Sequence, residues 1–220
     1  MNPLWYIILC CFCNYISYPI VKLLLNWKYP NFKPYSEKRQ NYIIKNYIKH
    51  YVLKYISIST FPFTILLIFN IGDQSNYIHF IGALYACCDT VALFKNIQLS
   101  KSTKIHHTIT TFLSIVNTTI TWSDTTSIMK LLAVYTIFSC YSYDVNYCLG
   151  MRFLLNTEQQ SVIKKNALYT YLLTCFINWS IHLFYFITYF TSLYFTGIVY
   201  FSLIAFIAYD DIILLKWLSR

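Results

Sequence analysis

The sequence has little charge and very little glycine. Only 11% of its 220 residues are charged, whereas soluble domains typically carry about 25%. Hydrophobic residues make up 57%, and the mean hydropathy is +0.48. This balance predicts one integral membrane domain, because the length suits several spans of about 20 residues but leaves no room for a separate soluble domain. With four glycines, the broken helices of many transporters would be hard to build.

Cysteine is absent from the predicted outer connections, and no spacing of cysteine with histidine suggests a zinc site. The eight cysteines all lie inside predicted spans, at positions 10, 11, 13, 87, 88, 140, 148 and 175. Disulfides and zinc are therefore not expected, and the thiols are interpreted as small buried apolar groups. We predict no metal site and no cofactor.

Basic residues are missing before the first apolar run, since Lys22 is the first positive charge. A cleaved signal peptide would begin with a basic segment, so we interpret residues 4–25 as an uncleaved first helix. The predicted spans are 4–25, 51–71, 77–97, 105–123, 127–150, 167–188 and 196–215. Helices satisfy their own backbone in lipid, and the alternation of barrel strands is missing. The predicted fold is therefore an all-α bundle of about seven spans.

Lysine and arginine occur almost only in alternate connections. The connections near Asp73, Asp124 and Ser192 carry almost none, with Lys130 as the exception. By the positive-inside rule, this pattern predicts an outer or lumenal N-terminus and a cytoplasmic C-terminus. Topology and anionic lipid thus account for the net charge of +9, and nucleic acid is not an expected partner.

Three regions are expected along the chain. Residues 1–37 form the first span and a basic loop, residues 38–215 a six-helix membrane domain, and residues 216–220 a short basic tail. Within the long connection 26–50, the segment 41–51 places tyrosines near one face and Lys45 and Lys49 near another. This pattern is typical of an interfacial helix that runs into the second span.

The fourth predicted span carries two adjacent polar stripes. At helical spacing, His107, Thr111, Ser114 and Thr118 form one stripe, and His106, Thr110, Asn117 and Thr121 form the other. Ionisable groups inside a membrane usually face a bundle interior or a wet cavity. We therefore expect His106 and His107 to mark the functional site.

Other spans offer partners for this histidine pair. Asp89, Asp144 and Arg152 are predicted at the depth of the two histidines, in the cytoplasmic third of the membrane. A neutral histidine beside a carboxylate can act as a general base, so His106, His107, Asp89 and Asp144 are the candidate catalytic residues. The alternative is a buried polar network that locks the helices together.

The last two spans carry further polar groups. In the sixth span, Asn178 and His182 belong to a polar stripe for which structural packing is favoured. In the seventh, Asp210 and Asp211 are expected to pair with Lys216 or Arg220 at the interface.

At these residues the chain resembles the TLC-domain family of multi-pass membrane proteins, which includes the ceramide synthases. "LYACCDTVALF" (84–94) is similar to the family's Tyr-x-x-x-Asp span, and "HHTIT" (106–110) to its His-His-x-x-Thr motif. "YSYDVNYCLGMRF" (141–153) and "NYIIKNYIKH" (41–50), with His50, resemble other family segments. The chain departs from the ceramide synthases after His107, where it has "SIVNTTITWSDTTS" (114–127). The resemblance therefore favours a shorter branch of the family.

The resemblance implies lipid handling in the endoplasmic reticulum or a related membrane. The implied activity is acyl transfer or regulation of lipid composition, with membrane lipids and a fatty acyl-CoA as partners. The sequence does not decide whether the chain forms a homo-oligomer. The expected substrate-binding residues are Arg152, Thr110, Asn117, Asn178 and His182.

Four other functions are less favoured by the sequence. A proton- or ion-coupled carrier would use Asp89 and Asp144 as a relay, and a non-catalytic scaffold would use the polar groups for packing. A seven-helix receptor lacks its usual outer cysteine, its Asp-Arg-Tyr motif and a retinal lysine. A haem-binding bundle would use His106 and His182.

Overall fold

The chain folds into an all-α structure, seen in a computed structural model that describes residues 2–68, 75–95, 97–120, 128–189 and 195–220. The described residues form helices and contain no strand. The helices, in chain order, are α1 (Leu4–Lys28), the short 3₁₀ helix η1 (Pro30–Phe32), α2 (Glu37–Ile68), α3 (Ser75–Phe94), α4 (Lys101–Asn117), α5 (Ile128–Cys140), α6 (Tyr143–Met151), α7 (Thr157–Tyr189) and α8 (Phe195–Ser219).

Four of these helices are long and apolar enough to cross a membrane. They are α1, α3, α7 and, from Gly197 to Ser219, α8. Helix α5 is apolar but has only 13 residues. The described residues thus support an integral membrane protein with four candidate spans, where the sequence predicted seven. The predicted outer connections near Asp73, Asp124 and Ser192 lie outside the described residues.

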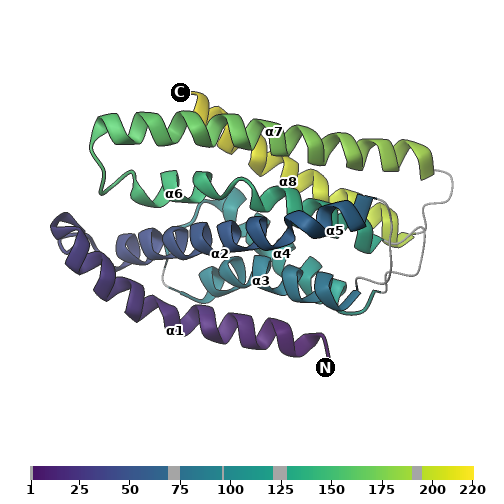
Figure 1. Cartoon of the computed structure of the whole chain (residues 1–220), viewed down its shortest axis with the longest axis horizontal. Coiled ribbons are helices and arrows are strands. Elements are labelled where there is room, and N and C mark those ends of the chain that lie inside the picture. The colour runs from purple at the N-terminus through teal and green to yellow at the C-terminus, as the bar shows by residue number, and fades with distance from the viewer. Residues whose placement is uncertain (1, 69–74, 96, 121–127, 190–194) are drawn as a thin grey trace.

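The helices run roughly along one long axis, with α2 in the middle of the bundle (Figure 1). Helices α1 and α7 lie on opposite outer sides. Helix α2 packs against α6, α5, α1 and α3, while α4 packs between α3 and α8. The N-terminus and the C-terminus lie toward opposite ends of the long axis.

Helix α1 shows how an apolar sequence divides between protein and lipid. Its buried residues, Cys10, Asn14, Tyr18 and Leu25, follow a single helical stripe that faces α3. Large apolar side chains such as Trp5, Phe12 and Leu23 are exposed on the other faces. A continuous apolar surface of this kind is what a lipid-facing helix presents.

Helix α2 differs from the sequence expectation. It is continuous from Glu37 into the predicted second span, as expected, but residues 43–50 are buried on every face. The expectation of an interfacial helix at 41–51 was therefore wrong. Since α6 covers α2 closely, a Cβ at Gly150 would lie 3.0 Å from the Asn46 Cβ atom.

The predicted fifth span, 127–150, is two helices rather than one. Helix α5 ends at Cys140, and Ser142 adopts a non-helical conformation (φ −85°, ψ 22°) before α6 begins. The Ser142 hydroxyl donates to the Ser139 carbonyl oxygen at 2.6 Å. A serine side chain that bonds a nearby carbonyl competes with the helical ladder, which favours a break at this point.

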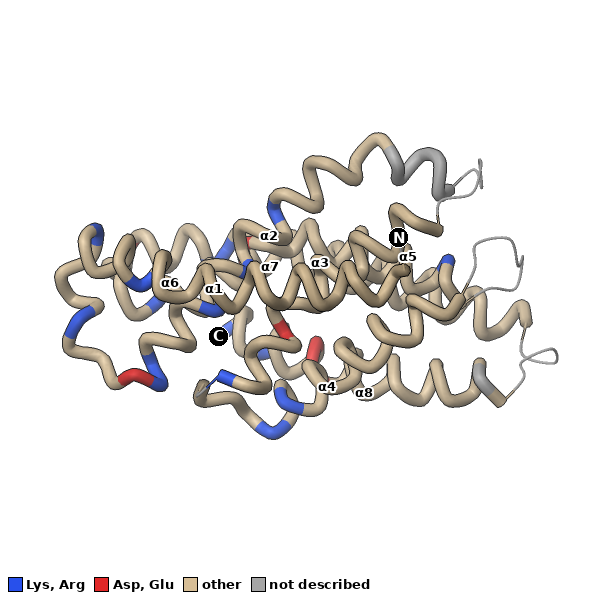
Figure 2. Tube along the Cα trace, turned by 90° about the horizontal axis from the view of Figure 1, so that it is seen from below, with Lys and Arg blue, Asp and Glu red and all other residues tan. Residues whose placement is uncertain are grey.

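Basic residues gather toward one end of the bundle. Figure 2 shows most Lys and Arg positions in the half that holds α6 and the C-terminus, with few in the half that holds the N-terminus. Some acidic positions lie near the middle of the bundle, where α4 packs between α3 and α8, and others lie at the basic end. The site is built around the acidic groups near the middle.

Candidate functional site

A buried carboxylate, Asp89 on α3, is the centre of the site. Its side chain has no exposed surface and contacts two other helices. Lys49 of α2 donates from Nζ to both carboxylate oxygens, at 2.6 and 2.8 Å. His107 of α4 places Nδ1 2.9 Å from Asp89 Oδ1. Three helices therefore meet at one ionic cluster, which we call the Asp89 cluster: Lys49, Asp89 and His107.

Close packing between α3 and α4 fixes the depth of this cluster. The Thr90 and Thr111 hydroxyls lie 2.9 Å apart across the two helices. A Cβ at Gly82 would come within 2.8 Å of Asn117 Nδ2, so a larger residue at position 82 would require the Asn117 amide to shift. Helix α4 begins at a conventional cap, in which Ser100 Oγ accepts from the Thr103 amide at 3.1 Å.

The contact with Asp89 assigns the proton on His107. An ionised carboxylate can only accept, so the neutral imidazole carries its hydrogen on Nδ1. The Nδ1–H direction is poorly aligned for a hydrogen bond despite the short distance. The other ring nitrogen, Nε2, is buried and has no hydrogen-bond partner among the described residues. It is therefore the ring nitrogen that is left to accept a proton.

The neighbouring histidine has its own carboxylate. His106 Nδ1 lies 3.2 Å from Asp210 Oδ2 on α8, and the next residue, Asp211, accepts a 2.6 Å hydrogen bond from the Tyr171 hydroxyl of α7. The expectation that these two acids pair with Lys216 or Arg220 was therefore wrong. Both turn into the bundle instead.

A cavity of about 640 Å³ adjoins both histidines. Its lining includes the ionisable side chains of Lys49, His106, His107, Asp210 and Asp211. The volume lies within the range of about 300–1,000 Å³ that is typical of ligand sites. Other lining residues include Arg39, Tyr42, Tyr85, Ser100, Ser102, Thr103, Tyr135, Ser139, Asn146, Arg152, Phe153, Tyr171, Asn178 and Trp217.

Asp144 does not join the site, contrary to expectation. It lies in the first turn of α6, is partly exposed, and has Oδ1 3.9 Å from His50 Nδ1. It does not line the cavity. The helix break at Ser142 explains the error, because the face of Asp144 cannot be extrapolated through a helix that has ended.

The five expected substrate-binding residues divide into two groups. Arg152 and Asn178 line the cavity. Thr110 and Asn117 do not, and instead line a smaller space of about 30 Å³ between α3 and α4. His182 donates from Nδ1 to the Asn178 carbonyl at 2.7 Å and accepts at Nε2 from the Tyr200 hydroxyl at 2.9 Å. His182 does not line the cavity, and both of its ring nitrogens have partners inside the bundle.

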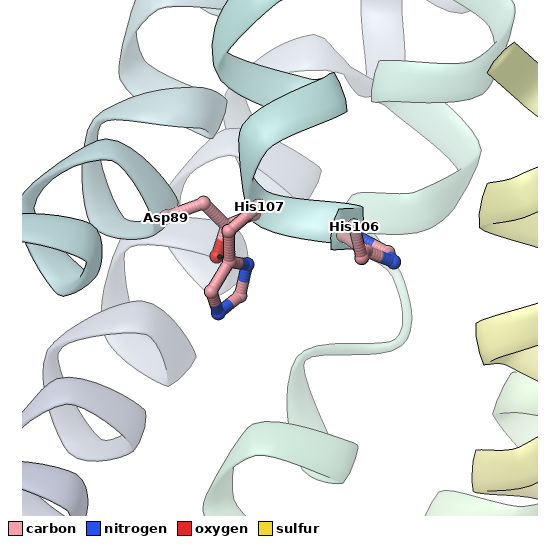
Figure 3. A group of neighbouring side chains, drawn as sticks. All are labelled: Asp89, His106 and His107. Carbon is pink, nitrogen blue, oxygen red and sulfur yellow. Dashed lines mark ion pairs between the residues drawn. The ribbon is translucent and has the colours of Figure 1, made fainter. Parts of the chain in front are cut away.

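Three residues could in principle hold a metal ion. Asp89, His106 and His107 offer ligand atoms within 4.8 Å of one another. Figure 3 shows Asp89 and His107 pointing together, while His106 extends away from them. Lys49 donates to both Asp89 oxygens, so a metal dication bound there would be repelled by the Lys49 ammonium. The charge pattern therefore favours proton transfer over metal binding.

Sequence reasoning missed Lys49 and Asp210 as site residues. Lys49 was counted among the topological charges, but it lies in a run of buried residues of α2. The signal in the sequence that could have identified Lys49 was its spacing of four residues from Lys45, in a segment rich in aromatic residues. Asp210 was the easier of the two to predict, since an acid inside the last apolar run needs a partner.

The electrostatics of α2 just before the predicted second span follow from burial. Burial and the neighbouring Lys49 charge lower the pKa of Lys45 to about 8. Burial acts in the same direction on Lys49, but the Asp89 carboxylate outweighs it and raises the pKa of Lys49. Lys49 therefore stays charged, and its charge keeps Asp89 ionised.

Comparisons of the chain with protein-family models, with curated proteins and with solved structures found no match in any of the three.

Proposed function

We propose that the chain is a TLC-type, lipid-handling membrane protein that transfers an acyl group from a fatty acyl-CoA to a lipid amine or hydroxyl. One observation carries the proposal: His107 lines the 640 Å³ cavity, its Nε2 has no partner among the described residues, and its Nδ1 faces Asp89. This is the arrangement of an oriented general base.

The reaction needs one proton acceptor at the cavity wall. His107 Nε2 takes the N–H or O–H proton of the acceptor lipid. At the same time, the lone pair on that nitrogen or oxygen of the lipid forms a bond to the acyl carbon. The C–S bond to CoA then breaks, and the departing thiolate takes the proton from Nε2. Asp89 stabilises the imidazolium between these steps, and Lys49 keeps Asp89 ionised. Asp89 and Lys49 are thus positioning residues.

The proposed setting is the endoplasmic reticulum or a related membrane, with the basic end of the bundle in the cytoplasm. The gathering of Lys and Arg at one end supports this orientation (Figure 2). We keep seven crossings, with an outer N-terminus, as the proposed topology. In that orientation the cavity would open on the side where acyl-CoA is made available to membrane enzymes.

Acyl transfer by isolated membranes tests the proposal. Membranes that contain the wild-type chain are expected to transfer radiolabelled fatty acid from acyl-CoA to a lipid, and His107→Ala should abolish the transfer. Asp144→Asn is the matched control, because it changes an acid that does not line the cavity. Wild-type membranes that transfer no more label than vector membranes would contradict the enzymatic function.

A further inference from the structure

The chain has only three arginines, and two of them line the cavity. Fourteen of its 17 basic residues are lysines, yet Arg39 and Arg152 both contribute to the cavity wall. Surface lysines suffice for membrane topology, because any positive charge serves that purpose. Guanidinium differs from ammonium in its planar fork of donors, which binds phosphate and carboxylate with two parallel hydrogen bonds.

Neither guanidinium has an acidic partner among the described residues. Each lies over the face of Phe153 instead, with Cζ 4.5 Å from the ring centroid for Arg39 and 4.7 Å for Arg152. Arg152 also lies 4.9 Å from the Trp217 ring. A cation–π contact needs no carboxylate, so the N–H groups of both guanidiniums can still donate to an anion. The aromatic rings thus hold two unpaired cations at one place in the cavity.

These arginines lie some distance from the base. Arg39 precedes Lys49 by ten residues on α2, which corresponds to about 15 Å along the helix. The N-terminus of α4 borders the same cavity through Ser100, Ser102 and Thr103. A helix N-terminus favours negative charge, and Ser102 at this one already contacts the Asp210 carboxylate.

We infer that the Arg39–Arg152 part of the cavity binds a phosphate group of the substrate, whose reacting end reaches His107. The inference rests on the proposed function, because it assigns a second contact to the same cavity. The phosphate could belong to a membrane lipid headgroup or to a soluble phosphorylated carrier such as CoA. The chemistry of recognition is shared, and the experiment separates the two sources.

Binding to the purified full-length chain in a neutral maltoside detergent tests this inference. The lipid arm compares short-chain phosphatidic acid with diacylglycerol of the same chains, and the soluble arm compares CoA with pantetheine. In at least one arm, the phosphorylated molecule is expected to raise the melting temperature and its partner to have no effect. A response in the lipid arm identifies a headgroup, one in the CoA arm identifies the carrier, and both together show that phosphate alone is recognised.

Paired substitutions locate the binding. Arg39→Gln with Arg152→Gln should weaken binding at least tenfold, whereas Lys33→Gln with Lys38→Gln should leave it unchanged. Both double variants remove two positive charges, but the lysines are exposed and do not line the cavity. If the arginine double variant fails to fold, Arg152→Lys keeps the charge and removes the fork, and should still weaken binding severalfold.

Three outcomes would overturn the inference: no preference for phosphate in either arm, equal losses in the two double variants, or wild-type affinity in Arg152→Lys. His107→Ala separates this site from the proposed reaction, because it should bind phosphate as the wild type does. A chain that binds phosphate through the arginines but transfers no acyl group would refute the proposed function alone.

Discussion

Removing one partner of the Lys49–Asp89 pair should destabilise the protein more than removing both. Asp89→Leu leaves a buried ammonium without its carboxylate, and Lys49→Met leaves a fully buried carboxylate with only His107. Breaking a buried ion pair in this way costs roughly 3–5 kcal/mol. For a chain of this length, that corresponds to a fall in melting temperature of about 10 °C.

The double variant replaces the buried charges with apolar groups of similar size. Such a replacement is often close to neutral, and the remaining loss is the contact that His107 makes with Asp89, about 1 kcal/mol. We therefore expect Asp89→Leu with Lys49→Met to melt only about 3 °C below the wild type. It should nevertheless be inactive, because nothing then orients His107.

The assay is thermal unfolding in detergent, followed by intrinsic fluorescence, with monodisperse elution before heating. Stability and acyl transfer are measured on the same preparations. The reasoning fails if the double variant melts as low as either single variant, or if either single variant loses less than about 1 kcal/mol. Activity in the folded double variant would remove Asp89 from the mechanism.

Three further substitutions test the packing around the site. Gly82→Ala should cost about 1–3 kcal/mol, because its Cβ would overlap Asn117 Nδ2 at 2.8 Å, and Asn117→Ala in the same chain should restore part of the melting temperature. Tyr171→Phe should cost about 1.5–3 kcal/mol in the same assay, since Asp211 loses the hydroxyl that donates to it at 2.6 Å. Lys45 has a folded pKa of about 8 against an ordinary 10.5, so the folded state binds fewer protons between these values and stability should rise with pH there. Relative to Lys45→Met, the wild type should gain about 3 kcal/mol across this window in pH-dependent denaturation, and a constant difference would contradict the assignment.

Hydropathy and periodicity predicted the parts of the fold that depend on the helix alone. The all-α class, the continuous helix through residues 41–68 and the inward polar face of α4 follow from apolar runs and helical spacing. The placement of Asp89 with His107 followed from estimates of depth in the membrane, and the 2.9 Å contact agrees with it. Burial of α2 could not be predicted this way, because its lysines resemble ordinary interfacial charges until α6 and α3 cover them.

The partner of His106 shows why long-range pairing escaped the sequence. Adjacent residues on a helix point about 100° apart, so His106 and His107 cannot share one carboxylate. Helix α4 lies between α3 and α8, and each histidine therefore meets an acid from a different neighbour. Asp89 is 17 residues before His106 in the chain and Asp210 is 104 after it, a separation that no local pattern connects. Because α8 carries Asp210, the orientation of His106 and the inner wall of the cavity depend on how α8 docks against α4, whereas the orientation of His107 depends on α3.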